Sequence, residues 1–171
     1  MAKRPKFKVG QTVFYPSAGV GVIEAVEEIY LAGAMQCCYV IRVPETHMVV
    51  KVPVERAEKS GVRPLLDARK LKELFKILGA RSRKRVTGGN WTERCKVIER
   101  KINSGSYVEL GEVVRDLMRW KKRSGLSFEE SLLLETASGY LAREIAAVQG
   151  IDMNDARARI SSYIGVQNHH Q

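Results

Sequence analysis

Trp91 and the lysines and arginines on either side of it form a group whose residue types and spacing are suited to binding a polyanion. The segment from Arg81 to Arg123 holds thirteen Lys/Arg and five Asp/Glu, so it carries a net +8 of the whole chain's +10. Cations that displace counterions from phosphates gain affinity for nucleic acid without reading its sequence. An indole ring can stack on an exposed base or enter a distorted base step. The alternative is a basic face that is only solvated.

No catalytic or metal-binding constellation emerges from the other residue types. Cys37, Cys38 and Cys95 lack the spacing of a zinc site or a redox pair, so we expect reduced, packed thiols. Gly19-Val20-Gly21 lacks the third glycine and the acidic residue of a dinucleotide site, and it predicts a tight turn. The sequence has no phosphate-binding loop and no plausible nucleophile with a base partner. We therefore predict that the protein is not an enzyme and uses no metal or cofactor.

Length and hydrophobicity restrict the class of protein. A chain of 171 residues with 44% hydrophobic content can form one domain or two small ones with buried cores. No run reaches the roughly 20 apolar residues that a membrane-spanning helix needs. The first residues, from Met1 to Gly10, lack the hydrophobic region of a signal peptide. We expect a cytoplasmic protein that does not contact a membrane.

The N-terminal part has the pattern of short strands separated by turns. Four runs rich in apolar and β-branched residues occur there: Val13–Tyr15, Val20–Tyr30, Met35–Val43 and His47–Val54. The last two are joined by Pro44-Glu45-Thr46, which predicts an antiparallel hairpin. Strands this short and close together favour a small barrel or a strongly bent sheet. Bends are expected at Gly10, Gly19 and Gly21.

The pattern becomes helical after Pro64, because proline discourages a helix at the residue before it. Five helices are predicted. The first covers Asp67–Leu78, and the second begins after Asn90. The third and fourth begin at the capping pairs Ser106/Glu109 and Ser127/Glu130, and the fifth covers Asp152–Tyr163. The predicted fold class is α+β in two domains. Residues 1–62 are expected to form a small β-barrel domain, and residues 63–66 a linker. Residues 67–165 are expected to form an all-α domain of five helices, followed by a frayed tail at residues 166–171.

Two of the predicted helices combine an apolar stripe with basic residues, which form the opposite side of the helix after Ser106 and both flanks of the stripe in the helix after Asn90. At 100° per residue, the helix after Ser106 places Leu110, Val113, Val114, Leu117 and Trp120 on one side. Its other side carries Arg115, Arg119 and Lys122, with Arg123 nearby. In the helix after Asn90, Trp91 begins an apolar stripe that continues through Cys95, Ile98 and Ile102. Periodicity thus indicates a buried Trp91, whereas nucleic-acid stacking requires an exposed one.

The order of several motifs resembles the CarD/CdnL family of bacterial transcription regulators. The resemblance begins at Phe7-Lys-Val-Gly-Gln-Thr-Val-Phe-Tyr-Pro-Ser-Ala-Gly-Val-Gly21. Further matches follow in order: Val52-Pro53, Gly61-Val62-Arg63, Asn90-Trp91 with Arg94, Ser104-Gly105, Glu112–Leu117 and Gly125-Leu126-Ser127. They extend to about Ile164. The first portion also resembles the polymerase-interacting domain of the transcription-repair coupling translocase, but the chain has no helicase motifs.

This resemblance implies a Tudor-like N-terminal domain that docks on the β subunit of bacterial RNA polymerase. It implies a helical C-terminal domain that reaches promoter DNA at the upstream edge of the transcription bubble. The implied protein is a monomer without enzymatic activity, nucleoid-associated through polymerase, that stabilises the open promoter complex. Trp91 would press into the minor groove at the fork junction, which favours an exposed ring over a buried one.

The resemblance also implies site residues. An exposed edge strand can pair with a strand of a partner, and we expect this edge at His47–Pro53, the alternative being an interior strand pair. The expected polymerase-binding residues are Ile29, which replaces a family arginine, and Met48, Val49, Val50, Lys51, Val52 and Pro53. The expected DNA-binding residues are Asn90, Trp91, Arg94 and Lys96, with Ser131 replacing a DNA-facing lysine of the family. Arg119, Lys122 and Arg123, from the basic side of the helix after Ser106, are added as DNA-binding residues that compensate electrostatically for the missing lysine.

Two other functions are compatible with the sequence. One is a stand-alone basic protein that binds DNA or RNA without polymerase, which lysate pull-down would separate from the polymerase-bound regulator. The other is a protein-interaction adaptor that makes no DNA contact. Because phosphate contacts weaken as salt rises, a salt titration of DNA binding distinguishes this adaptor from a nucleic-acid binder.

Overall fold

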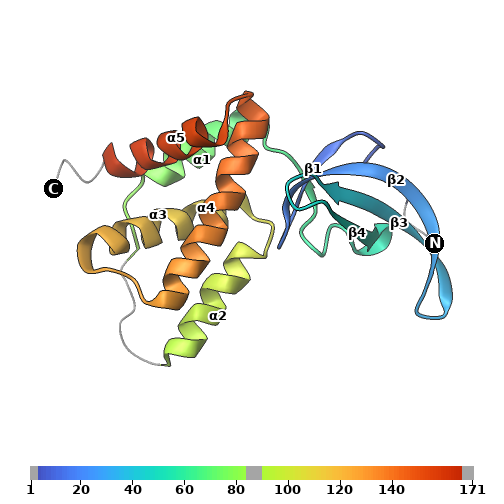
Figure 1. Cartoon of the computed structure of the whole chain (residues 1–171), viewed down its shortest axis with the longest axis horizontal. Coiled ribbons are helices and arrows are strands. Elements are labelled where there is room, and N and C mark those ends of the chain that lie inside the picture. The colour runs from blue at the N-terminus through green and yellow to red at the C-terminus, as the bar shows by residue number, and fades with distance from the viewer. Residues whose placement is uncertain (1–3, 84–89, 167–171) are drawn as a thin grey trace. The chain divides into compact units, whose positions relative to one another are not determined.

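The computed structural model describes residues 4–83 and 90–166, and the chain divides into two compact units, Met1–Leu65 and Leu66–Gln171. The first unit is built from strands and the second from helices (Figure 1). The predicted α+β fold class, with a small β domain followed by five α-helices, is therefore confirmed for the described part of the chain.

The β unit contains one antiparallel sheet. Its strands are β1 (Thr12–Tyr15), β2 (Gly19–Leu31), β3 (Ala34–Val43), β4 (Met48–Pro53) and β5 (Arg63–Pro64), in the order β4-β3-β2-β1-β5. A 3₁₀ turn, η1 (Val54–Arg56), follows β4. The long β2–β3 hairpin has a register shift between Ile23 and Ala25, which is a β-bulge that bends the strand. The predicted β3–β4 hairpin is present.

Cross-strand neighbours form the core of the β unit. Ile23 pairs with Ile41 and Tyr39 pairs with Val52, and all four side chains are buried. The Tyr39 hydroxyl accepts a 2.8 Å hydrogen bond from the backbone N–H of Lys6, which fixes the segment before β1. A Cβ atom on Gly21 would lie only 2.6 Å from Cγ2 of Ile41, so this close approach of β2 to β3 requires a glycine.

The fifth strand lies in the segment that the sequence assigns to a linker. Arg63 and Pro64 pair with Phe14 and Val13 of β1, and the Arg63 guanidinium carbon lies 4.5 Å from the centre of the Phe14 ring. A strand of two residues has no periodicity that sequence analysis can detect. It forms because β1 offers a free side for pairing and an aromatic ring for the cation.

The helical unit contains α1 (Ala68–Gly79), α2 (Trp91–Ile102), α3 (Tyr107–Ser124), α4 (Phe128–Gln149) and α5 (Met153–Val166). The first four helices begin where capping residues predict. In each, the side chain of the cap accepts a hydrogen bond from a backbone N–H of the first turn, and the caps are Asp67, Asn90, Ser106 and Ser127.

The helical core lies where α3 packs against α1 and α4. Leu74, Leu78, Leu117 and Leu141 are at most 1% exposed. Gly111 of α3 allows the close approach to α1, because a Cβ atom there would lie 2.8 Å from Cδ1 of Leu74. This core positions the first turns of α2 and α4 and the last turn of α3, which carry the candidate DNA contacts.

Candidate docking strand and nucleic-acid interface

β4 is an edge strand of the described sheet, since it pairs with β3 and lies at one end of the strand order. The predicted edge is confirmed, and the alternative of an interior strand pair is wrong. Met48 and Val49 are 42% and 50% exposed, and Lys51 is also exposed. Val52 is buried against the core. β4 therefore combines an open edge with exposed apolar and basic side chains, which suits pairing with another protein strand.

Ile29 does not lie beside the other expected docking residues. It is half-buried on β2 and is in register with Gln36 of β3. Pairing between β3 and β4 begins at Cys38, which lies opposite Pro53, and residues of β3 before Cys38 have no partner in β4. Ile29 is therefore on the part of the β2–β3 hairpin that extends past the end of β4. The structure brings residues 48–53 together and leaves Ile29 apart from them.

Trp91 occupies the first position of α2 and is 36% exposed. Its stripe runs into the core, because Ile102 at the other end is only 3% exposed and Cys95 and Ile98 are half-buried. The periodicity correctly identified the stripe, but full burial of Trp91 is wrong. A side chain at the first turn shares the buried side of a helix and still projects past the end of the core.

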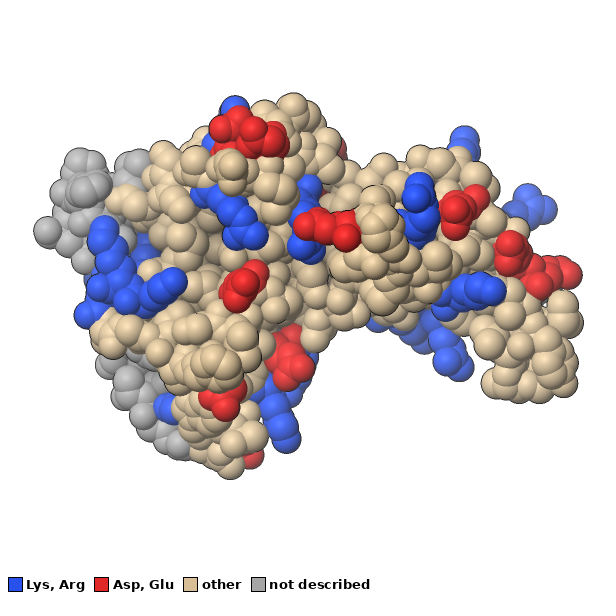
Figure 2. All heavy atoms as spheres, viewed as in Figure 1, with Lys and Arg blue, Asp and Glu red and all other residues tan. Residues whose placement is uncertain are grey.

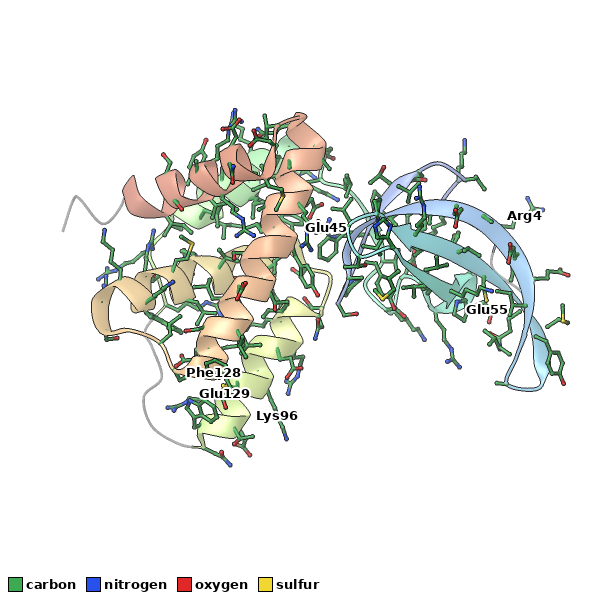
Figure 3. All side chains as sticks on the ribbon, in the orientation of Figure 1. Arg4, Glu45, Glu55, Lys96, Phe128 and Glu129 are labelled. Carbon is green, nitrogen blue, oxygen red and sulfur yellow. The ribbon has the colours of Figure 1, made fainter. Side chains whose placement is uncertain are left out.

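Polar and basic residues surround this first turn. Asn90 is exposed, and its Oδ1 accepts a 3.0 Å hydrogen bond from the backbone N–H of Thr92, so its side chain caps α2. Lys96 is exposed and projects outward from α2 (Figure 3). Arg94 is half-buried and lies on the other side of the apolar stripe. The two cations therefore flank the stripe that begins at Trp91.

Arg119 is a correction to the predicted DNA contacts. It is 3% exposed, and its guanidinium donates hydrogen bonds to the backbone oxygens of Ala80 (2.6 Å), Leu78 (3.3 Å) and Ile164 (3.3 Å). Burial, together with the neighbouring Arg115, lowers the pKa of Arg119 from its ordinary value. This side chain binds the ends of α1 and α5 inside the unit, so it is not available to DNA.

Arg115, expected on the same basic side, is also buried. Its Nε donates to Oδ1 of Asp116 (2.9 Å), and one of its terminal nitrogens donates to the backbone oxygen of Ile77 (3.2 Å). The Ile77 oxygen also accepts a 3.1 Å hydrogen bond from the backbone N–H of Ala80. Both arginines donate to carbonyl groups near the C-terminal end of α1, where the last carbonyls of a helix have no partner one turn further along the helix. Helical periodicity cannot reveal this, because it does not show that another helix covers the polar side of α3.

The exposed cations of α3 lie in its last turn. Lys121, Lys122 and Arg123 are all exposed, and Figure 2 shows Lys and Arg gathered over the C-terminal end of α3. Cations are also favoured there by the helix dipole. Lys84 and Arg85, which belong to the basic segment from Arg81 to Arg123, lie outside the described residues. Within the basic segment from Arg81 to Arg123, α2 and the last turn of α3 therefore both present exposed cations.

Sequence analysis did not single out Phe128, the most exposed aromatic residue in the described part of the chain. Phe128, at the first position of α4, is 75% exposed, and Leu132 one turn later is 48% exposed. Both lie off the apolar pattern of α4, whose buried members include Leu134 and Leu141. A helical wheel of this segment would have shown them opposite the core.

The described residues show no other chemistry. In the ranges 4–83 and 90–166, no group of three or more His, Cys, Asp or Glu side chains could hold a metal ion. The cysteines are unpaired thiols there, and burial raises the pKa of Cys95, as do the nearby carboxylates of Glu130 and Glu129. None of the described helices is long and apolar enough to cross a membrane.

The fold and these surfaces define a class of two-domain α+β protein, with an edge strand suited to a protein partner and a basic helical unit suited to nucleic acid. The chain belongs to the CarD-like family of transcription factors. Residues 7–66 match the family described as CarD-like/TRCF RID domain, and residues 73–161 match the family described as CarD, C-terminal domain.

A curated relative extends the similarity along both chains. The protein named "Putative transcription factor YdeB" from Bacillus subtilis (strain 168) is 36% identical over 145 residues, which cover 85% of this chain and 94% of the relative. The resemblance to the CarD/CdnL regulators is thus confirmed. The family is a type of transcription factor rather than a class of enzymes.

Proposed function

We propose that this protein binds the β subunit of bacterial RNA polymerase through β4 and stabilises the open promoter complex through its helical unit. In this proposal it acts as a cytoplasmic monomer that reaches the nucleoid with polymerase. Family membership supports a role in transcription. The observation that carries the DNA contact is the exposed indole of Trp91 at the start of a basic helix.

The polymerase contact is a strand added to the open side of β4. Backbone N–H and C=O groups on that side pair with a strand of the partner, and the side chains that alternate along β4 set specificity. Lys51 supplies a positive charge, and Met48 and Val49 supply apolar contact area. Val50 and Val52 pack against the core of the β unit, and Pro53 is the last residue of β4. Ile29 would meet the same partner beyond the end of β4.

The DNA contact has two parts. The indole of Trp91 enters the minor groove at the edge of the bubble, where base steps are already distorted and cost less to separate. Asn90, Arg94 and Lys96 at the start of α2, and Lys122 and Arg123 in the last turn of α3, contact the sugar-phosphate backbone. Arg119 is not part of this surface, because its guanidinium is buried.

The two contacts reinforce each other because one chain carries both. Binding of the β unit to polymerase raises the local concentration of the helical unit at the promoter, so weak DNA contacts become sufficient. If Trp91 contacts only parted strands, it favours the open state by its difference in affinity between the two states. A difference of ~1.4 kcal/mol shifts that equilibrium about tenfold.

Replacement of Trp91 by alanine tests this function. We expect the variant to retain polymerase but to shorten the lifetime of the open complex to that of polymerase alone, because the contact specific to parted strands is lost. The measurement is the decay of open complexes after addition of a competitor, with the β subunit followed by co-purification.

Val97→Ala is the matched control, since Val97 is a 44% exposed apolar residue on the same helix. It should leave the lifetime unchanged. Equal lifetimes for wild type and Trp91→Ala would refute the role of the indole. A wild-type chain that binds DNA but retains no β subunit from a bacterial lysate would indicate a stand-alone nucleic-acid binder instead.

A further inference from the structure

Phe128 has an exposed aromatic ring that the fold does not use. Its side chain is 75% exposed, the largest fraction among the large apolar residues in the described part of the chain. At 100° per residue it lies opposite the side of α4 that carries the buried Leu134, Ala137 and Leu141. An exposed aromatic ring that contributes nothing to the core leaves its face open for stacking on a nucleic-acid base.

The backbone of Phe128 is held in place. A capping box closes around it, because Ser127 Oγ accepts a 3.2 Å hydrogen bond from the backbone N–H of Glu130. In return, the backbone N–H of Ser127 donates to Oε1 of Glu130 at 3.1 Å. The ring therefore projects from a fixed point, so binding costs little conformational entropy.

Phe128 lies at the same end of the α2–α4 pair as Trp91. The two helices pack side by side, and Figure 3 places Phe128 and Glu129 at the start of α4 next to α2. The Cys95 thiol, one turn after Trp91, is close enough to the Glu129 and Glu130 carboxylates to be affected by their charges. Two aromatic side chains, one exposed and one partly exposed, thus occupy neighbouring helix starts.

We propose that Phe128 is a second aromatic contact for parted DNA and binds the face of an unpaired base beside the Trp91 site. This inference rests on the proposed function. Stacking suits the site because every base has an apolar face, and the contact needs no particular sequence. The adjacent Glu129 repels phosphate, so the contact is with a base and not with the backbone. Lys96 supplies attraction for the backbone nearby.

The test compares the affinity of the full chain for a forked DNA with its affinity for a fully paired duplex of the same sequence, at low salt. Phe128→Ala should weaken fork binding about tenfold, equal to ~1.4 kcal/mol, and leave duplex binding unchanged. Phe128→Tyr should retain fork binding, because a phenol ring also stacks. Leu132→Ala is the matched control and should change neither affinity.

The outcomes separate this inference from the proposed function. If Phe128→Ala changes fork and duplex binding equally, or changes neither, the inference is wrong. If Trp91→Ala still loses the fork preference, only the role of Phe128 fails. If Trp91→Ala also has no effect, or wild type does not bind the fork, both proposals fail. Normal fork binding by Phe128→Ala with shorter-lived polymerase–promoter complexes would overturn the inference in favour of a protein partner.

Discussion

The cations of α3 have two different roles, which depend on burial. The Arg119 guanidinium is inside the helical unit and donates hydrogen bonds to carbonyl groups at the ends of α1 and α5. Lys122, less than one turn later, is exposed. A buried charge is tolerated only where hydrogen bonds replace its hydration. Arg119 therefore stabilises the fold, whereas Lys122 is available to an external anion.

Replacement of Arg119 by methionine should lower the free energy of unfolding by about 3 kcal/mol. Methionine fills similar space, but the backbone oxygens of Leu78, Ala80 and Ile164 lose a charged donor while they stay away from water. The measurement is urea unfolding followed by far-UV circular dichroism, which reports mainly on the helical unit.

Lys122→Met is the matched control for this prediction. It removes the same charge from an exposed position, so the free energy of unfolding should change by no more than about 0.5 kcal/mol. Its affinity for DNA should fall instead, because a phosphate contact is lost. Similar stabilities for the two variants would contradict the structural role of Arg119.

At the scale of elements, capping residues decide where helices begin and small residues decide how closely they pack. Asp67, Asn90, Ser106 and Ser127 cap the helices that the sequence predicts after them. A glycine inside a helix costs stability, and a packing requirement explains it where a neighbouring helix leaves no room for a side chain. Gly111 meets that requirement where α3 approaches α1.

Gly111→Ala should therefore destabilise the helical unit by about 1 kcal/mol. The added methyl group would lie 2.8 Å from Cδ1 of the buried Leu74, and the cost of overpacking exceeds the gain in helix propensity. Gly165→Ala is the control, because no atom lies within 4 Å of the added Cβ in α5. That variant should be as stable as wild type or up to about 0.5 kcal/mol more stable. Thermal unfolding checks the sign of each change, and a stabilising Gly111→Ala would contradict the packing argument.

At the scale of the whole molecule, the chain separates two kinds of surface between its two units. The β unit, nearly balanced in charge, carries the edge strand, and the helical unit carries the basic segment together with Trp91 and Phe128. A substitution on one of these surfaces should leave the other surface intact. The proposed function therefore predicts that recruitment and DNA binding are separable by mutation.

Lys51→Glu should abolish co-purification of the β subunit and leave the affinity of the chain for forked DNA unchanged. The substitution reverses an exposed charge on the docking strand, and charge reversal at an interface opposes association. The measurements are pull-down of polymerase and fluorescence anisotropy with labelled DNA.

Lys59→Glu is the control for net charge, because Lys59 is exposed in the same unit but outside β4. It should retain the β subunit. Retention by Lys51→Glu would show that β4 is not the docking strand. Loss of DNA binding as well would mean that the substitution disrupts the fold.

Much of the fold could be predicted from the sequence because local signals are strong at particular residues. Runs rich in apolar and β-branched residues predicted β2 and β3, and Asn90 and Ser127 predicted helix starts. The ordered motifs identified the family. β5 was missed because two residues carry no period. Phe128 was missed because it lies off the apolar period of α4, which marks only the residues that form the core.

The sequence by itself determined the element types, the two-part organisation, the family and the position of the positive charge, since these depend on residue order and local periodicity. Only the tertiary structure decided which polar side chains face water. Arg115 and Arg119 are buried because α1 and α5 cover that side of α3. Trp91 is partly exposed because the core ends before the first turn of α2. Burial depends on contacts between segments far apart in the chain, and no single helix encodes them.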